Sequence, residues 1–301
     1  MNIHEYSKIL ELIGKVAQQE SRKKAKLDFL FDAEFRVYSQ WGEDGIIEWL
    51  VSNLTSIPKK FIEIGVENYT EANTRFLLIN RNWRGLLVEQ NKVHVEMIKK
   101  SDLYWRHDVA VINSFVNVDN INDIFVSSRY DGDVGILSID IDGNDYWLWE
   151  AIDTINPWIV VCEYNAVFGD IYPLVVPYDE TFNRTSAHYS NLYFGTSIQA
   201  LISLGVKKGY SFVGTNRAGN NAFFVRDDVS HYVLSKMRNI SAMPSLFRES
   251  RNLDGELTYV AGLQRSEIIK ELPFVDVVSG VEGKLSEFGE IYSDRWRKTM
   301  S

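Results

Sequence analysis

The stretch that decides the fold runs Phe61-Ile62-Glu63-Ile64-Gly65-Val66-Glu67-Asn68-Tyr69. Its first five residues predict a short apolar strand that ends in an acid and a glycine, and a helical pattern follows over 70–79. Similar units succeed it, with strands predicted at 85–89, 107–111, 134–140 and 158–162 and helices at 92–100, 121–128 and 146–152. Short strands that alternate with helices indicate an α/β fold with a mostly parallel sheet.

The chain after the fifth strand follows a different pattern. Residues 165–192 show no clear period, and we interpret them as an insertion that covers the mouth of the sheet. A helix over 197–207 and strands over 210–214 and 222–226 follow, and the two strands are predicted to close the sheet as a hairpin with one antiparallel strand. This divides the chain into N-terminal helices (1–57), a core (58–226) and a tail (227–301) that packs on the core or on a second subunit of a homodimer.

The N-terminal segment is predicted to be an amphipathic helix. From Ile3 to Val16 apolar residues recur at helical spacing, and a basic cluster ends the segment at 22–26. We expect the helix to pack on the body of the protein, with docking to an anionic membrane surface as the alternative.

Composition excludes several classes of protein. Thirty-two Lys and Arg against 41 Asp and Glu give a net charge of −9, which opposes binding to nucleic-acid phosphates. No apolar run reaches the roughly 18–20 residues of a membrane span, and charged residues interrupt the N-terminal segment, unlike a secretory signal. The single cysteine, Cys162, cannot form an internal disulfide. We therefore expect a cytoplasmic protein that binds a small molecule.

Acidic residues follow the predicted strands. They are Glu63, Glu89, Asp108, Asp140, Asp142 and Glu163. Because ligands of open parallel sheets bind at the carboxyl ends of the strands, we expect these acids to line one site. The alternative is that each is a solvated acid at the end of a strand.

The turn after the first strand indicates the kind of ligand. It keeps Gly65, the first glycine of a nucleotide-binding turn, but Glu67 stands where the second glycine would be. Glu89 follows Gly65 by 24 residues, close to the ~20-residue offset at which an acid binds ribose hydroxyls. Since Glu67 would repel a pyrophosphate, the pattern favours an adenosine ligand with an ammonium group and no phosphate. S-adenosylmethionine fits this description better than NAD.

Four runs of residues carry a family resemblance. Tyr38-Ser39-Gln40-Trp41-Gly42-Glu43-Asp44-Gly45, Phe61–Gly65, Trp83–Glu89 and Leu137–Asp145 resemble class I S-adenosylmethionine-dependent methyltransferases of the FkbM-like kind. The resemblance implies a Rossmann-like, seven-stranded sheet with helices on both faces and an antiparallel closing strand. It also implies that N-terminal residues Gln40 and Glu43 cover the cofactor.

The resemblance assigns further cofactor roles to the strand ends. Glu63 and Gly65 would hold the methionine part of S-adenosylmethionine, Glu89 the ribose, and Asp108 would lie near the adenine. Apart from the resemblance, and in the absence of a metal, Asp140 or Asp142 is a candidate for the general base or for orienting the ammonium group.

A local resemblance adds a metal. The run Asp142-Gly143-Asn144-Asp145-Tyr146 is similar to a segment of metal-dependent sugar O-methyltransferases, in which the first acid binds magnesium. Asp142, Glu163 and Asn165 would then be the Mg²⁺ ligands and would lower the pKa of a bound sugar hydroxyl. The alternative without metal uses Asp142 as a base, with His188 of the insertion as a second catalytic candidate.

These patterns predict a transferase that methylates a hydroxyl of a sugar or of a glycosylated or nucleotide-linked small molecule, with surface polysaccharide synthesis as one setting. A non-catalytic Rossmann-like binding or scaffold protein is the alternative, and an NAD-dependent oxidoreductase is disfavoured by Glu67.

Overall fold

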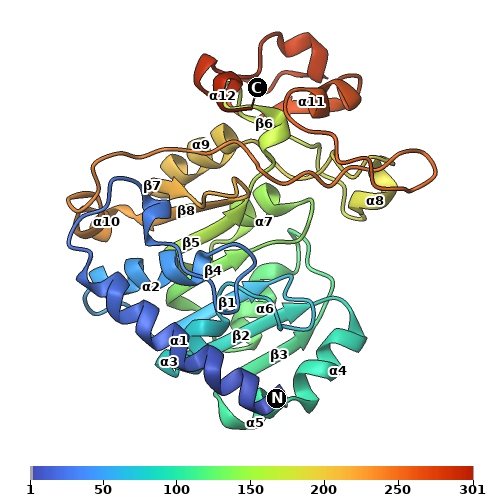
Figure 1. Ribbon diagram of the computed structural model, residues 1–301. Helices are drawn as coiled ribbons and strands as arrows, with labels where there is room; N and C mark the ends of the chain where they lie inside the picture. Colours follow the sequence, from blue (N-terminus) through green and yellow to red (C-terminus); the bar gives the residue numbers. More distant parts are fainter. Residues whose placement is uncertain (1–2, 301) are drawn as a thin grey trace.

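A seven-stranded sheet in the order β3-β2-β1-β4-β5-β8-β7 forms the centre of the computed structural model, which describes residues 3–300 (Figure 1). Its strands are β1 (Lys60–Ile64), β2 (Arg84–Glu89), β3 (Val109–Asn113), β4 (Gly132–Ile139), β5 (Ile155–Glu163), β7 (Tyr210–Thr215) and β8 (Asn221–Arg226). Strand β8 is antiparallel to both neighbours, and the other neighbouring pairs are parallel. The predicted fold class, a Rossmann-like and mostly parallel sheet of seven strands with one antiparallel strand, is confirmed.

Helices cover both faces of the sheet, as a parallel sheet requires. One face packs on α6 (Ile121–Ser127), α7 (Asp145–Ala151) and α9 (Ile198–Lys208). The other packs on α2 (Glu43–Asn53), α3 (Arg75–Arg81), α4 (Lys92–Lys100) and α10 (Asp227–Leu234). Successive residues of a strand point alternately into the hydrophobic cores on the two faces of the sheet. Ile62 belongs to the core on the first face and Phe61 to the core on the second.

Helix α1 (Ile3–Lys23) packs on α2 with a face that lies next to the predicted apolar stripe and not with the stripe itself. Its buried residues from position 8 on are Gly14, Gln18 and Ser21, and a Cβ on Gly14 would lie 2.6 Å from the ring of Phe76. The apolar stripe that includes Ile13 and Val16 is exposed instead. The reason is that the small residues allow close approach, while Gln18 donates a hydrogen bond to buried Glu48.

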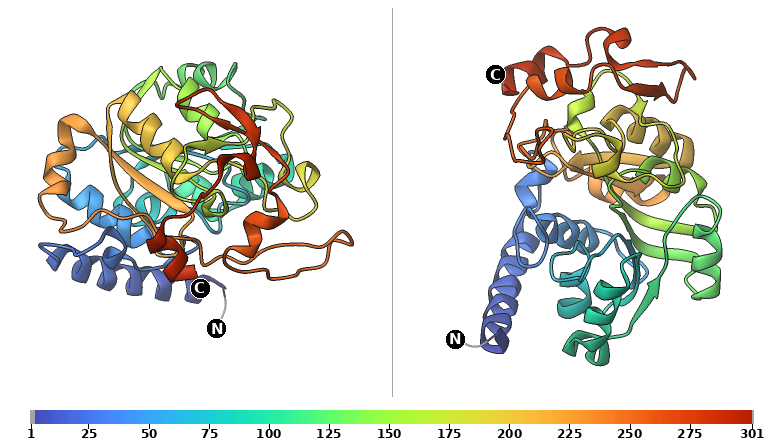
Figure 2. Two further views of the ribbon diagram at one scale, coloured as in Figure 1. Left: turned by 90° about the horizontal axis from the view of Figure 1, so that it is seen from above. Right: turned by 90° about the vertical axis from the view of Figure 1, so that its right-hand side faces the viewer.

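The insertion and the tail fold together beside the sheet. Strand β6 (Leu174–Val175) of the insertion pairs with β9 (Pro273–Asp276) of the tail, which pairs with β10 (Glu282–Lys284). The short helices of these segments are α8 (Arg184–Ala187), α11 (Gln264–Ile268) and α12 (Asp294–Met300), and α5 (Asp102–Arg106) follows α4 in the core. Both figures place the tail next to the insertion (Figures 1 and 2). Trp296 of α12 is buried in the same cluster as the sheet.

No helix in the part of the chain that the structure describes is long and apolar enough to cross a bilayer.

Candidate functional site

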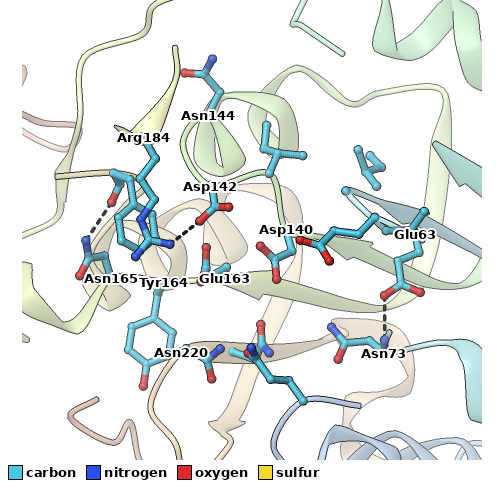
Figure 3. A pocket seen from close by; sticks show the side chains of 18 of the residues that line it. Glu63, Asn73, Asp140, Asp142, Asn144, Glu163, Tyr164, Asn165, Arg184 and Asn220 are labelled. Carbon is cyan, nitrogen blue, oxygen red and sulfur yellow. Dashed lines mark hydrogen bonds and ion pairs between the residues drawn. The ribbon is translucent and has the colours of Figure 1, made fainter. Parts of the chain in front are cut away.

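A cavity of about 550 Å³ opens at the carboxyl ends of the strands (Figure 3). It lies where the strand order reverses between β1 and β4, which is the usual ligand position in open α/β sheets. Of the predicted site residues, eight line it: Gln40, Glu63, Gly65, Glu89, Asp140, Asp142, Glu163 and Asn165. Glu43, Asp108 and His188 do not.

Gly65 turns the chain at the end of β1, and only glycine fits there. Its φ is +78°, and a Cβ on it would lie 1.7 Å from the backbone oxygen of Asp140. The Gly65 N–H donates to the Val88 carbonyl at 3.0 Å. The turn therefore lies in close contact with both β2 and β4, and its backbone forms part of the cavity wall.

Glu63 closes the amino end of α3. Its carboxylate accepts hydrogen bonds from the backbone N–H groups of Asn73 (2.8 Å) and Thr74 (3.1 Å) and from the Thr74 hydroxyl. The side chain is buried, and this burial raises its pKa. Two N–H groups that directly precede α3 are therefore already bound to a carboxylate and are not offered to an anionic ligand.

Glu67 and Glu89 act together at the next turn. Glu67 has a left-handed backbone (φ +47°), and its N–H donates to Glu89 Oε2 at 2.8 Å. Glu89 Oε1 accepts the N–H of Asn91 at 2.7 Å. Each carboxylate oxygen keeps a further lone pair, so Glu89 can still accept hydroxyl donors of a ligand in the cavity.

Asp108 lies outside the cavity, at the opposite end of the sheet from the one predicted. Strand β3 begins at Val109, two residues later than the sequence indicates, so Asp108 precedes the strand. Its carboxylate is exposed and lies 3.7 Å from Arg84 Nε. The residues that follow β3 and line the cavity are Ser114, Phe115 and Val116.

Gln40 and Glu43 have different environments although they are close in sequence. Gln40 is exposed and lines the cavity. Glu43 is fully buried outside it: Oε2 accepts the N–H groups of Trp41 and Gly42, and Oε1 accepts the side-chain amides of Asn216 and Asn221. Glu43 thus fastens the N-terminal segment to the β7–β8 hairpin and does not reach the cofactor position.

Asp140 and Glu163 form a pair of carboxylates in the cavity. Ile139 and Cys162 are partners in the β4–β5 register, so the next residues on the two strands lie side by side. Glu163 Oε2 is buried with no hydrogen-bond partner among the described residues. Burial, and then the charges of neighbouring acids, raise the pKa of both groups well above the usual carboxyl range.

Asp145 completes a group of three acids whose oxygens lie within 4.8 Å of one another. Its own oxygens accept the N–H groups of Ile141 (2.9 Å) and Gly143 (3.0 Å), and burial raises its pKa to about 6. The hydrogen bonds give Asp145 a structural role in the β4–α7 turn. Because Asp145 does not line the cavity, Asp140 and Glu163 are the two acids of this group that a ligand can reach.

The predicted magnesium ligands are not assembled as one site. Asn165 uses its whole side chain within the protein: Nδ2 donates to the carbonyls of Leu192 and Phe194, and Oδ1 accepts the N–H of Val167. Asp142 is half exposed and binds Arg184 Nη1 at 2.7 Å. The positive charge of this guanidinium opposes a cation at Asp142, and the amide of Asn165 is held by the protein, so these residues do not fit the predicted metal.

His188 does not line the cavity. Its Nδ1 lies 2.7 Å from the hydroxyl of Ser190, and burial lowers its pKa. The insertion instead places Arg184 in the cavity wall, although the sequence gives no motif around it.

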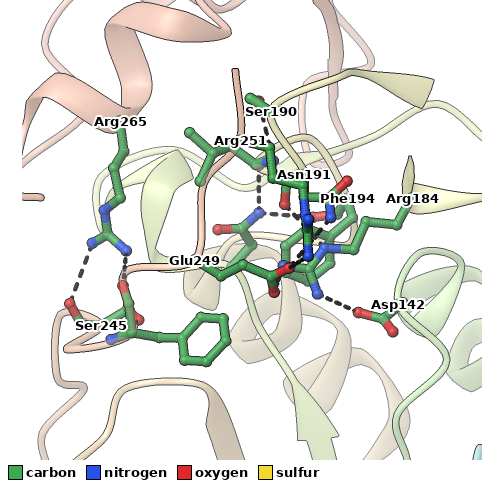
Figure 4. A network of polar contacts seen from close by, with 12 residues as sticks. Asp142, Arg184, Ser190, Asn191, Phe194, Ser245, Glu249, Arg251 and Arg265 are labelled. Carbon is green, nitrogen blue, oxygen red and sulfur yellow. Dashed lines mark hydrogen bonds and ion pairs between the residues drawn. The ribbon is translucent and has the colours of Figure 1, made fainter. Parts of the chain in front are cut away.

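The tail supplies the residues that sequence analysis missed. Glu249 and Arg265 line the cavity, and Glu249 lies between Arg184 and Arg251 in a polar network (Figure 4). Arg265 donates to the carbonyls of Phe247 and Ser245. These contacts join segments that are distant in sequence, and the irregular tail has no periodic pattern that would have indicated them.

Comparison with known proteins shows likeness at the level of the fold. No family model and no curated protein matches the chain. Among solved structures, an S-adenosylmethionine-dependent methyltransferase from Clostridium acetobutylicum superposes with a TM-score of 0.38 and 8% identity over 61% of this chain and 90% of that one. The N-terminal domain of EvdMO1, solved in the presence of SAH and D-fucose, gives 0.39 and 10% over 75% and 95%.

The pyocyanin biosynthetic protein PhzM gives a TM-score of 0.34 and 10% identity over 57% of this chain and 52% of that one. The chain thus spans about half the length of PhzM. At such low similarity these likenesses do not bear on activity, so the chemistry is derived from the cavity.

The cavity fits a nucleoside better than a nucleotide. The N–H groups of Glu67, Asn73 and Thr74 are bound to carboxylates, so these three donors of the turn are not offered to a phosphate. Glu89 offers acceptors at the end of β2, where an acid binds ribose hydroxyls. The pair of Asp140 and Glu163 favours a positive charge nearby. S-adenosylmethionine, with a ribose, an ammonium and a sulfonium, meets these three conditions.

Proposed function

We propose that the chain is an S-adenosylmethionine-dependent O-methyltransferase whose acceptor is a hydroxyl of a sugar or of a glycosylated small molecule. The observation that carries the proposal is the Glu63 carboxylate on the amino end of α3, at 2.8 Å and 3.1 Å from two N–H groups. This carboxylate takes up two N–H groups just before α3, and Glu89 at the end of the next strand offers acceptors for a ribose. This combination disfavours NAD and favours an adenosine without phosphate.

The cofactor would lie along the ends of β1, β2 and β4. Gly65 and Glu63 would border its methionine part, Glu89 its ribose, and the residues after β3 its base, while Gln40 would cover it from the N-terminal segment. S-adenosylmethionine supplies an electrophilic methyl group when it is bound. The chain itself must then orient an acceptor hydroxyl and take its proton.

Asp140 and Glu163 are the groups proposed to hold that proton. Their burial and mutual proximity raise both pKa values, so the pair binds a proton more readily than an ordinary carboxylate at neutral pH. This role replaces the one predicted for His188, which faces Ser190. Asp142 is proposed to position Arg184, with which it pairs at 2.7 Å.

The charge of the cavity limits the choice of acceptor. Two arginines line it, but Arg184 already pairs with two acids and Arg265 with two carbonyl oxygens. A nucleotide-linked acceptor would bring negative charges to an acidic wall without a free cation there. An uncharged acceptor is therefore favoured over a nucleotide-linked one.

Calorimetry with S-adenosylmethionine, its demethylated product and NAD⁺ tests the proposal. We expect the two adenosyl ligands to bind and NAD⁺ not to. Glu89→Gln should weaken their binding by about tenfold or more, because a hydrogen bond to a charged group contributes ~1.5–3 kcal/mol. Asp108→Asn is the matched control and should bind like the wild type, since Asp108 lies at the other end of the sheet. No binding of either adenosyl ligand at millimolar concentration would falsify the proposal.

A further inference from the structure

A second cavity of about 420 Å³ lies beside the first, on residues 241–260 of the tail, which we call the strap. The strap has little regular secondary structure but is held at several points. Leu246 N–H donates to the Ala218 carbonyl at 2.8 Å, and Arg251 N–H to the Ser190 carbonyl at 3.1 Å. Arg265 also binds two strap carbonyls (Figure 4). The second cavity is thus a fixed feature of the surface.

The two cavities share a wall. Phe247 and Glu249 line both of them. The ring of Trp41 contacts Phe247 edge to face, with centroids 6.2 Å apart, and Trp41 follows Gln40 of the first cavity directly. A molecule bound in the first cavity could therefore extend past Phe247 into the second.

The lining of the second cavity combines apolar surfaces with a charged edge. Trp41 is 40% exposed and Tyr259 59%, and two leucines of the strap are also exposed. Exposed apolar surface with a polar rim is typical of a binding site. Here the polar groups are Glu249 and Arg251, which pair at 3.4 Å, and Arg248.

We propose that this second cavity is a subsite for another sugar ring of the acceptor, so that the substrate has at least two linked rings. The proposal rests on the proposed function. A pyranose ring has C–H faces that pack on aromatic rings such as Trp41 and Tyr259, and hydroxyl edges that can bind Glu249 and Arg251. An alkyl chain would cover the same apolar surface but would offer no acceptor to Arg248, whose side chain has no hydrogen-bond partner among the described residues. The shared wall is what connects this subsite to the acceptor.

The test compares one-ring and two-ring probes on the full chain. Methyl glycosides of glucose, galactose and mannose and the corresponding disaccharides are titrated by saturation-transfer NMR, with and without the demethylated cofactor product. We expect at least one disaccharide to bind tenfold or more tightly than its methyl glycoside. Trp41→Ala and, independently, Tyr259→Ala should remove this advantage. Trp105→Ala is the control, because Trp105 is 72% exposed on α5 and lines neither cavity.

Any of the following outcomes overturns the subsite. One is that no disaccharide binds better than its glycoside, and another is that Trp105→Ala weakens binding as much as Trp41→Ala. The third is that decanoate binds at Trp41 and competes with no sugar, or that Trp41→Ala turns a dimer into a monomer in sedimentation, which would assign the surface to a lipid chain or a second copy. Failure of the proposed function can be distinguished from failure of the subsite. In that case the wild type does not bind the adenosyl ligands in calorimetry, while sugar binding is measured separately by NMR.

Discussion

Replacing Gly65 with alanine should separate β1 from β4 at the floor of the cavity. The new Cβ would lie 1.7 Å from the Asp140 carbonyl oxygen, where real Cβ contacts are at least 3.0 Å, so one strand end has to move by more than an ångström. The left-handed backbone, with φ of +78°, costs about 1–2 kcal/mol for a residue with a Cβ. Overpacking against a fixed backbone adds about 1–3 kcal/mol. From the backbone cost and the overpacking cost combined, we expect Gly65→Ala to lower the free energy of unfolding by about 2–5 kcal/mol.

Gly132→Ala separates the two effects. Gly132 begins β4 with a φ of +74°, and a Cβ on it would meet no atom within 4 Å, so it reports the backbone cost alone. Denaturant unfolding of both variants measures the difference, and calorimetry with the demethylated cofactor product measures the effect on the cavity. Gly65→Ala should be the less stable and should bind more weakly, whereas Gly132→Ala should bind like the wild type. Equal stability of the two variants would refute the close approach of the turn to β4.

Three further results follow from the same contacts. Glu48→Ala should lower the free energy of unfolding by about 3–5 kcal/mol in denaturant unfolding, because it removes a fully buried carboxylate and leaves Arg81 without its partner. Arg184→Lys should raise KM for the acceptor on the order of tenfold with little change in melting temperature, since an ammonium cannot bridge two carboxylates as a guanidinium does. Because burial and then the charge of Asp140 raise the pKa of Glu163, Asp140→Asn should move the acid limb of the pH profile of kcat/KM to lower pH; a limb that stays in place contradicts the shared proton.

The central sheet could be predicted from the sequence because its signals are local. Apolar runs such as 61–64 and 85–88 are bounded by polar residues, and parallel strands bring their carboxyl ends to one edge, so Glu63, Gly65 and Glu89 meet as expected. Asp108 shows the limit of this reasoning. It is the second residue of the strand predicted at 107–111 and directly precedes β3, so strand direction places it at the amino end in both cases, and its expected place near the adenine came from the resemblance.

Other errors arose where partners are distant in sequence. Glu43 is capped by Asn216 and Asn221, more than 170 residues away, and no local pattern shows that it is buried. The helical period of α1 is correct, but period alone does not tell which face meets the body. The contacts with Phe76 and Glu48 decide which face is buried, and that face carries small and polar residues such as Gly14 and Gln18.

The acids at the strand ends are of two kinds, and the difference locates the chemistry. Glu63 and Glu89 accept backbone N–H groups and thereby shape the turn around the proposed cofactor. Asp140 and Glu163 accept no hydrogen bond from another side chain among residues 3–300, yet they lie in adjacent register positions with raised pKa values. A buried acid without a partner destabilises the fold unless a ligand or a proton compensates it. The acids at the ends of β1 and β2 therefore have a structural role in the turn, whereas the acids at the ends of β4 and β5 are the ones available for reaction.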